Sequence, residues 1–437
     1  MADTPLRQHQ IDYPDSAALQ DVLAVLKGFP PLVFPGEVDE LRTRLVAVSE
    51  GRAFILQGGD CVERFSDCTA ERITDKIKIL LQMSVVLTHA ARMPVLRIGR
   101  IAGQYFKPRS QEFEQIQGRR VLTYRGDPVH RFDPRGDNRT PDPRRLLEGY
   151  FHAAATHNYI RAMIAGGFAD LHHPLAWDLT SMEGTPQWQE YRHVVDRILE
   201  AISFMESFGG LNQESLGNID FYTSHEALHL PWEEAMTRRD PATGNLYNLA
   251  AHTVWLGART NGVDEGHVDY LRQIANPLGI KVGPEMTADH LAALLRLLDP
   301  QRTPGRITLI TRLGADRVHT RLPELLRVTR EEGNPVIWSC DPMHGNTVAT
   351  TGGRKTRTFT AILQELEHTF GVHRVAGSIV NGVHFELTGD EVTECTGGAV
   401  PLGEADLDRN YESWCDPRLN YTQSMEMAFL LGKLLRE

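Results

Sequence analysis

Eight short apolar runs recur along the chain, and each ends in polar or charged residues. Most are followed by a stretch with helical periodicity, and strand–helix alternation of this kind predicts a parallel sheet. Eight repeats predict an α/β fold of the (β/α)8 (TIM) barrel type, because polar residues follow every run. A doubly wound open sheet, whose site collects near one switch point, is the alternative. The runs are FILQGGDC, VLRIGRIAGQ, FYTSHE, HTVWLGART, IKVGPE, ITLITRLG, PVIWSCDPMHG and GVHFELTGD.

The seventh run shows how such a strand would present chemistry. Residues 335–347 read PVIWSCDPMHGNT, a buried strand that changes abruptly into a polar segment carrying Asp341 and His344. Pro342 and Gly345 inside that segment exclude a continuing strand or helix. A His and an Asp on such a loop are typical of the functional end of a barrel. An ordinary polar turn after a strand remains the alternative for this stretch taken alone.

The runs also divide the chain. Residues 1–52 are predicted to form an N-terminal helical extension, whose first helix spans residues 16–27 with Ser16 as its N-cap. Residues 53–437 are predicted to form the catalytic barrel. A segment of about 176–220 is predicted to be a helical insertion, because the spacing between the second and third runs is long for one crossover. A long crossover without a special role is the alternative.

Composition excludes several classes of function. A net charge of -11 argues against a nucleic-acid-binding protein. No apolar stretch is long enough to span a membrane, and the polar N-terminus predicts no signal peptide. The cysteines are five in number and scattered, with no CxxC spacing, so we expect reduced thiols and a cytoplasmic location.

Seven basic residues lie at or just beyond the ends of the apolar runs. In a protein of net negative charge, such a cluster indicates a compact anionic ligand, because Arg binds phosphate or carboxylate through paired hydrogen bonds and Lys adds a point charge. A surface ion pair is the alternative for any single member. The residues are Arg100, Lys107, Arg109, Arg259, Lys281, Arg312 and Lys355.

Four potential metal ligands also follow the runs: Cys61, His344, Glu386 and, near the C-terminus, Asp416. One thiolate, one imidazole and two carboxylates suit manganese, cobalt, iron or zinc better than magnesium or calcium. His384 competes with His344 as the imidazole ligand, and Cys61 could instead be an inert buried thiol. Bases for more than one phosphate together with a Lewis acid suggest carbon–carbon bond formation or phosphoryl chemistry on small phosphorylated metabolites. No Walker or dinucleotide motif is present.

Several long motifs in order resemble one family, the type II 3-deoxy-D-arabino-heptulosonate 7-phosphate (DAHP) synthases. The resemblance runs from about residue 15 to the C-terminus. It implies a (β/α)8 barrel and the first step of the shikimate pathway, a metal-dependent, aldol-like condensation of phosphoenolpyruvate with erythrose 4-phosphate that gives DAHP and phosphate. The motifs are QGGDC (57–61), RIGRIAGQYFKPRS (97–110), TSHE (223–226), IKVGP (280–284), LITRLG (309–314), CDPMHGNT (340–347), GVHFELTGDEVTEC (382–395) and CDPRLN (415–420).

Matching motifs imply roles for individual residues. The implied metal ligands are Cys61, His344, Glu386 and Asp416, with Mn²⁺ as the expected ion and Co²⁺ or Zn²⁺ as alternatives. The implied phosphoenolpyruvate site comprises Arg100, Lys107, Arg259, Lys281 and Arg312. Erythrose 4-phosphate would be bound by Arg109, Ser110 and Lys355. The candidates for proton transfer are Lys107, Lys281 and Glu226.

One motif departs from the family pattern. The chain reads GARTNG, with Ala258 and Asn261 where the family usually has an acid before the Arg-Thr pair and a base after it. Arg259 is retained. Amino-DAHP synthase of an aminoshikimate pathway therefore stays an alternative, as does a catalytically silent paralogue. The resemblance also implies a homo-oligomer, a dimer or tetramer, and a chorismate mutase as a potential partner.

Overall fold

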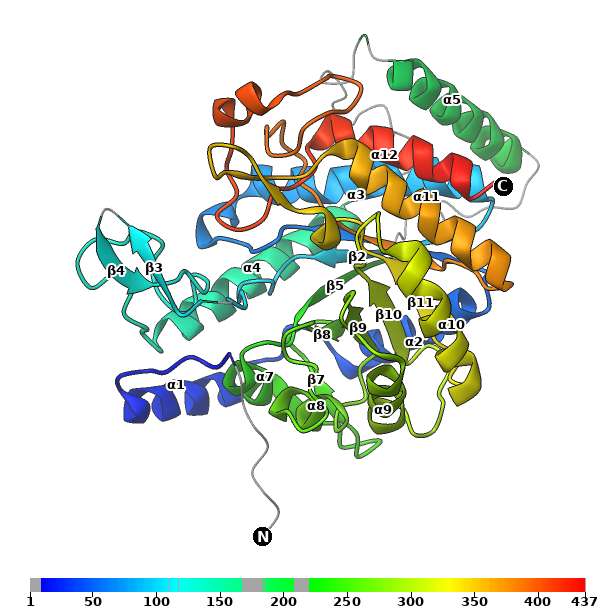
Figure 1. The fold of residues 1–437 in the computed structure, drawn as a ribbon. Coiled ribbons are helices and arrows are strands. Elements are labelled where there is room, and N and C mark those ends of the chain that lie inside the picture. Colours follow the sequence, from blue (N-terminus) through cyan, green and yellow to red (C-terminus); the bar gives the residue numbers. More distant parts are fainter. Residues whose placement is uncertain are drawn as a thin grey trace.

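The computed structural model describes residues 9–109, 111–116, 118–166, 184, 186–207 and 220–436. Eight parallel strands close into a barrel (Figure 1) in which each strand pairs with the next barrel strand along the chain, and β14 closes against β1. The closed barrel confirms the predicted (β/α)8 fold, and all eight apolar runs supply its strands. The strands are β1 (Phe54–Gly59), β2 (Val95–Arg100), β5 (Phe221–Glu226), β8 (Thr253–Leu256), β9 (Leu278–Val282), β10 (Ile307–Thr311), β11 (Ile337–Cys340) and β14 (Gly382–Glu386).

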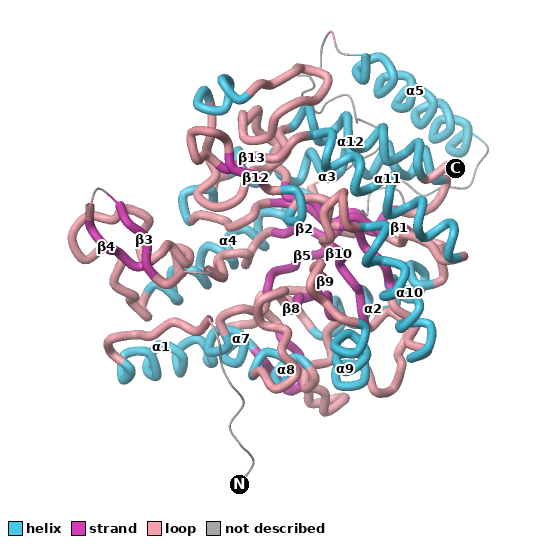
Figure 2. Tube along the Cα trace, in the orientation of Figure 1, coloured by secondary structure: helices cyan, strands magenta, loops and turns pink. Residues whose placement is uncertain are grey.

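Helices surround these strands (Figure 2), and some of them begin or end at a recognisable capping residue. Thr287 accepts a hydrogen bond from the His290 N–H at the start of α9 (Ala288–Leu298). Gly333 ends α10 (Val318–Glu332) with a φ of 71°, a left-handed conformation that glycine adopts at little cost. Other helices are α3 (Ala70–Ala91), α4 (Arg145–Ala165), α7 (Leu230–Met236), α8 (Gly266–Leu271), α11 (Phe359–Ala376) and α12 (Tyr421–Leu434).

The N-terminal segment forms two helices, α1 (Ser16–Gly28) and α2 (Pro35–Ser49). The predicted cap of the first helix is wrong by one residue. Asp15 is the N-cap, because its carboxylate accepts a hydrogen bond from the Ala18 N–H, whereas Ser16 is already helical.

The second N-terminal helix covers one end of the barrel. Its buried residues Leu41, Leu45 and Val48 belong to one apolar cluster with residues of several barrel strands. Apolar contact of this kind is the main stabilising term in folding, so α2 contributes to the barrel core rather than standing apart from it. The strand residues of that cluster are Ile55, Leu96, Ile98, Tyr222 and Ile337.

Among the described residues, the loops carry three small antiparallel sheets and one further α-helix. About half of the predicted insertion lies within the described residues, where it forms α5 (Pro186–Ser207), and the Tyr191, Val194 and Val195 side chains of this helix pack in the cluster that contains α3 and α12. No helix in the described part is long and apolar enough to cross a membrane. The sheets are β3 (Phe113–Ile116) with β4 (Arg119–Leu122), β6 (Thr237–Arg239) with β7 (Leu246–Asn248), and β12 (Val348–Ala349) with β13 (Lys355–Thr356).

Candidate active site

A pocket of about 210 Å³ lies among the loops that follow the barrel strands. Its walls are mainly polar and charged, so it is suited to a small anionic molecule rather than an apolar one. The five bases predicted to bind phosphoenolpyruvate all line it, together with Glu226. The lining residues are Cys61, Arg100, Gln104, Lys107, Pro108, Glu226, Trp255, Gly257, Ala258, Arg259, Lys281, Arg312, His344, Thr347, Lys355 and Asp416.

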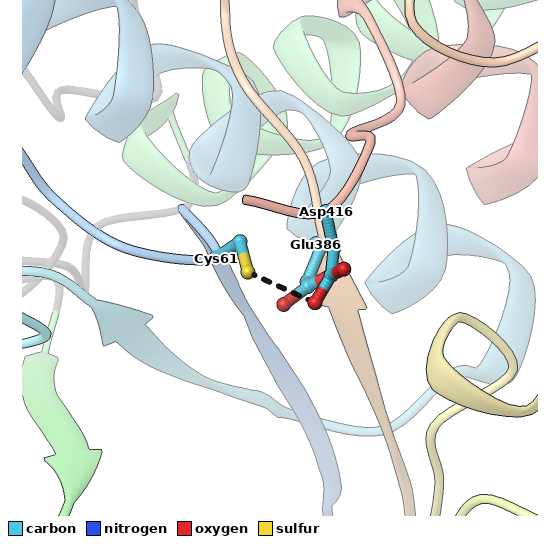
Figure 3. Close-up of side chains that lie close together, drawn as sticks. All are labelled: Cys61, Glu386 and Asp416. Atoms are coloured by element: carbon cyan, nitrogen blue, oxygen red, sulfur yellow. Dashed lines mark hydrogen bonds between the residues drawn. The ribbon is translucent and has the colours of Figure 1, made fainter. Parts of the chain in front are cut away.

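The four predicted metal ligands come together at one side of this pocket. Ligand atoms of Cys61, Glu386 and Asp416 all lie within 4.8 Å of one another (Figure 3). The Nε2 atom of His344 lies 2.9 Å from Oε1 of Glu386. Together they form a candidate metal-binding group with one sulfur, one nitrogen and carboxylate oxygen donors. His384, the competing imidazole, instead contacts the Arg100 guanidinium below the pocket.

Strand register brings these groups together. Gly59, at the end of β1, is paired with Glu386, at the end of β14, so Cys61 emerges beside that carboxylate. Gly59 has a φ of 143°, and a Cβ there would lie 2.6 Å from the Arg100 carbonyl oxygen. Glycine is therefore needed for the ends of β1 and β2 to approach each other this closely.

The two carboxylates of the group are held in their charged form. Burial alone would raise the pKa of Glu386, but the charges of His344, Arg357 and Arg100 outweigh it and hold the pKa well below its usual range. At Asp416, burial would also raise the pKa, but the charge of Lys107 opposes it, and the pKa of Asp416 lies well below its usual range. Both side chains are therefore ready to bind a cation without losing a proton.

The thiol behaves differently. Burial, followed by contact with the Cys415 side chain and the charge of Glu386, raises the pKa of Cys61 well above its usual value. The ammonium group of Lys107 lies 2.7 Å from the Cys61 sulfur and acts in the opposite direction. A cation bound here would displace the thiol proton, since the thiolate is the metal-binding form.

Asp341 orients the imidazole of the group. Its carboxylate lies 2.7 Å from Nδ1 of His344, and it also accepts a hydrogen bond from the Lys281 ammonium. A neutral His344 ring that donates its Nδ1–H to Asp341 has no proton on Nε2. Nε2 and the Glu386 oxygen that faces it are then both hydrogen-bond acceptors. Two acceptors at 2.9 Å need a shared proton or a shared cation between them. This arrangement fits a metal-bound imidazole supported by a carboxylate.

Three bases of the pocket are tied to acidic or aromatic groups. Arg100 pairs with Glu386 at 3.0 Å, and its guanidinium lies over the Trp255 ring at 5.2 Å. Lys107 pairs with Asp416 at 2.8 Å. Burial lowers the pKa of Lys281 to about 8, against the attraction of its carboxylate partner. Ion pairing offsets part of the desolvation cost of these charges.

Arg259 and Arg312 differ from those bases, since neither has a carboxylate partner within the described part of the chain. Arg312 donates to the His344 carbonyl oxygen at 3.1 Å, while exposed Arg259 follows Ala258, which carries no charge. Two uncompensated guanidinium groups on one pocket wall make a site for a doubly charged anion.

Two of the three residues predicted to bind erythrose 4-phosphate are described, and they contact the adjacent residues Cys415 and Asp416. Lys355 lines the pocket, is exposed and pairs with Asp416 at 2.8 Å. Arg109 is not among the residues that line the pocket; it donates to the Tyr124 carbonyl oxygen at 2.6 Å and contacts the Cys415 sulfur at 3.3 Å. Ser110 lies outside the described residues.

Several buried residues that support the site had no predicted role. Gln104 donates to the Cys61 carbonyl oxygen and accepts from the Glu226 N–H. Arg357 is fully buried and pairs with Glu386 at 2.8 Å. Buried polar residues that contact the site residues rather than the pocket follow no recognisable spacing in the sequence. Trp255, in the fourth apolar run, could have been recognised from its place near a strand end.

Comparison with known proteins agrees with this geometry. Residues 2–432 match the model of the class-II DAHP synthetase family. A Streptomyces coelicolor protein named phospho-2-dehydro-3-deoxyheptonate aldolase is 46% identical over 435 residues, covering 100% of this chain and 96% of the relative. A Neurospora crassa protein of the same name is 47% identical over 442 residues, covering 98% of this chain and 92% of the relative. The chain belongs to the class-II DAHP synthetase family.

Proposed function

We propose that this protein condenses phosphoenolpyruvate with erythrose 4-phosphate to give DAHP and phosphate, with one water consumed. The observation that supports this most strongly is the single pocket, which combines a candidate metal-binding group with bases suited to phosphate and carboxylate. Family membership and the name shared by the two relatives support the same reaction. No observation favours amino-DAHP synthase or a silent paralogue.

The proposed metal ligands are Cys61, His344, Glu386 and Asp416. Their mixed sulfur, nitrogen and oxygen donors favour Mn²⁺, with Co²⁺ and Zn²⁺ as the alternatives. When bound, such an ion supplies Lewis-acid polarisation of an aldehyde oxygen. The Asp341 carboxylate would keep the His344 ring in the orientation that presents Nε2 to the group.

The basic cluster, which we define as Arg100, Lys107, Arg259, Lys281 and Arg312, is proposed to bind phosphoenolpyruvate. Arg259 and Arg312 would take the phosphate, since neither has an acidic partner among the described residues. The buried Arg100 and Lys281 would fix the carboxylate end against the Trp255 ring. Holding the reacting carbon in place removes much of the entropic barrier to condensation.

Proton transfer is proposed to involve Lys107, Lys281 or Glu226. All three line the pocket, and the lowered pKa of Lys281 suits exchange of a proton near neutral pH. Glu226 is placed by Gly257, because a Cβ at that glycine would overlap the Glu226 carboxylate oxygen. The phosphate of erythrose 4-phosphate is proposed to bind Lys355, with Arg109 and Ser110 as further candidates.

We also propose a homo-oligomer of two or four subunits, a chorismate mutase as a candidate partner and a cytoplasmic location. Exposed Phe34 and Phe151, at 67% and 58% of their full accessible surface, support burial against another subunit. Light scattering of the purified protein would measure the subunit number, and a monomer at micromolar concentration would contradict the oligomer.

Phosphoenolpyruvate consumption by metal-stripped protein, before and after Mn²⁺ is restored, tests the function. We expect Mn²⁺-dependent turnover with erythrose 4-phosphate and release of one phosphate per DAHP formed. Turnover only with the amino-sugar counterpart would move the protein to an aminoshikimate pathway. Bound metal with no turnover of either acceptor would indicate a silent paralogue.

A further inference from the structure

Two active-site loops, one after β10 and one after β11, lie back to back. The first carries Arg312 and the second carries His344. Gly314 has a φ of 85°, and a Cβ on Gly345 would lie 2.3 Å from the Gly314 nitrogen, so the two backbones are in direct contact. Arg312, a candidate for phosphate binding, and His344, a candidate metal ligand, therefore lie on two loops whose backbones touch directly.

A buried carboxylate from a third element binds both loops. Glu365 lies on α11 and is fully buried. Its Oε1 accepts hydrogen bonds from the Leu313 N–H at 2.8 Å and the Gly314 N–H at 2.9 Å. Its Oε2 accepts from Nδ2 of Asn346 at 2.6 Å, two residues beyond His344. One side chain thus holds the residues next to Arg312 and next to His344.

Asn346 completes the connection between the two loops. Its Oδ1 accepts from the Ala315 N–H at 3.1 Å, and its Nδ2 also donates to the Pro342 carbonyl oxygen at 2.7 Å. These bonds fix which end of the amide faces Glu365, because a flipped amide would lose both of them. The donor facing Oε2 is therefore set by the fold.

We propose that Glu365 is a positioning residue that fixes the distance between the metal-binding group and the phosphate-binding Arg312. This inference rests on the proposed function, since it concerns how the same pocket is assembled. Glu365 does not line the pocket, so it would act only through the loops it binds.

The energetics of Glu365 favour such a role over simple stabilisation. Burial raises its pKa to about 8, although hydrogen bonds from Gly314, Leu313 and Asn346 favour the charged form. No cation pairs with it in the described part of the chain. A buried carboxyl group with this environment is weak evidence for stability, because an apolar side chain of similar size would avoid the desolvation cost. Three converging donors instead specify one arrangement of the two loops.

The experiment compares Glu365→Gln with Glu367→Gln, an exposed position two residues further along α11. Glutamine retains an acceptor for the two backbone N–H groups but presents its own NH₂ to Nδ2 of Asn346, so one contact is lost. We expect Glu365→Gln to weaken Mn²⁺ binding, measured by chelator competition, and phosphoenolpyruvate binding, measured by calorimetry, each about tenfold. Glu367→Gln should leave both dissociation constants unchanged.

A complementary exchange separates positioning from loss of fold. Asn346→Asp places a second carboxylate against Glu365, and we expect the same two affinities to fall. The double variant Glu365→Gln/Asn346→Asp restores a donor–acceptor pair, so both affinities should recover in part, even though Pro342 loses its donor. If Glu365→Gln does not fold, Asn346→Asp and the double variant still carry the comparison.

Folded Glu365→Gln protein with wild-type affinity for both ligands would overturn the positioning role, whatever its melting temperature. Loss without recovery in the double variant would also overturn it. A wild-type protein that binds Mn²⁺ but not phosphoenolpyruvate would instead refute the proposed function, and the positioning role would fall with it.

Discussion

The two ends of the barrel use the same eight strands for opposite purposes. At the end covered by α2, strand residues such as Ile55 and Ile98 are buried in one apolar cluster with Leu41 and Leu45. At the opposite end, the same strands lead to buried Arg100, Lys281, Glu386 and their neighbours. One end is stabilised by apolar contact, whereas the other retains charges whose burial costs free energy.

This difference shows that residues near the start of each strand stabilise the fold, whereas residues at and beyond its end supply the site, as is general in such barrels. The buried bases at the functional end are offset by carboxylates, as Arg100 is by Glu386 and Lys107 by Asp416, whereas Arg259 and Arg312 have no such partner among the described residues. Changes at the two ends should therefore alter different measurements. The following variants would sharpen or break that separation.

The largest effect is expected from Cys61→Ser. A hydroxyl replaces the thiolate donor of the candidate metal-binding group, and the Lewis-acid contribution at stake is several kcal/mol. We expect Mn²⁺-dependent turnover to fall by at least ~1,000-fold, with little change in urea unfolding. Cys68→Ser is the matched control, because the Cys68 thiol contacts Thr156 and the His152 carbonyl outside the pocket. Near-normal activity of Cys61→Ser would remove Cys61 from the ligand set.

A substitution at the end of the barrel covered by α2 should change the free energy of unfolding but not substrate binding. Leu41→Ala leaves a cavity under the strands, and we expect the free energy of unfolding to fall by about 2–5 kcal/mol in urea titrations. The KM for phosphoenolpyruvate should not change. Val25→Ala, at a position that is 45% exposed, should cost under about 0.5 kcal/mol. A Leu41→Ala protein with normal stability but an altered KM would break the separation.

Arg312→Gln should have an intermediate effect on kcat/KM, without a change in stability. Loss of a charged hydrogen bond of about 1.5–3 kcal/mol predicts a ~10–150-fold fall in kcat/KM for phosphoenolpyruvate in steady-state assays. Arg317→Gln serves as the control, because Arg317 is 57% exposed and pairs with Glu285 at 3.0 Å. Equal losses in both variants would indicate a general electrostatic effect rather than a binding contact.

The smallest effect is a pH dependence from Lys281. Its pKa of about 8 means that the ammonium is charged below that pH and loses its proton above it. We therefore expect kcat/KM for phosphoenolpyruvate, which reports the free enzyme, to fall up to about tenfold per pH unit above pH 8. Lys281→Arg should remove this limb, since guanidinium stays charged. An unchanged limb in that variant would assign the titration to another group.

The strands and the pocket-lining bases were predictable from sequence because each leaves a local signal. The apolar run ITLITRLG, for example, shows both a strand and the Arg312 that follows it. No local sequence signal shows whether His344 or His384 is the candidate imidazole ligand of the metal, because that depends on the register of neighbouring strands. Glu365 was also missed, since a buried helix carboxylate that binds two distant loops has no sequence spacing. Arg109 differs from the other predicted bases, because it belongs to a matching motif but is not among the residues that line the pocket.

The most direct test is a crystal structure with Mn²⁺ and phosphoenolpyruvate bound, using anomalous scattering to locate the ion. The predicted result is one Mn²⁺ peak among Cys61, His344, Glu386 and Asp416, with the phosphate of phosphoenolpyruvate against Arg259 and Arg312. An ion bound elsewhere, or a phosphate at the end of the barrel covered by α2, would contradict the central claim that one pocket combines metal and anion binding.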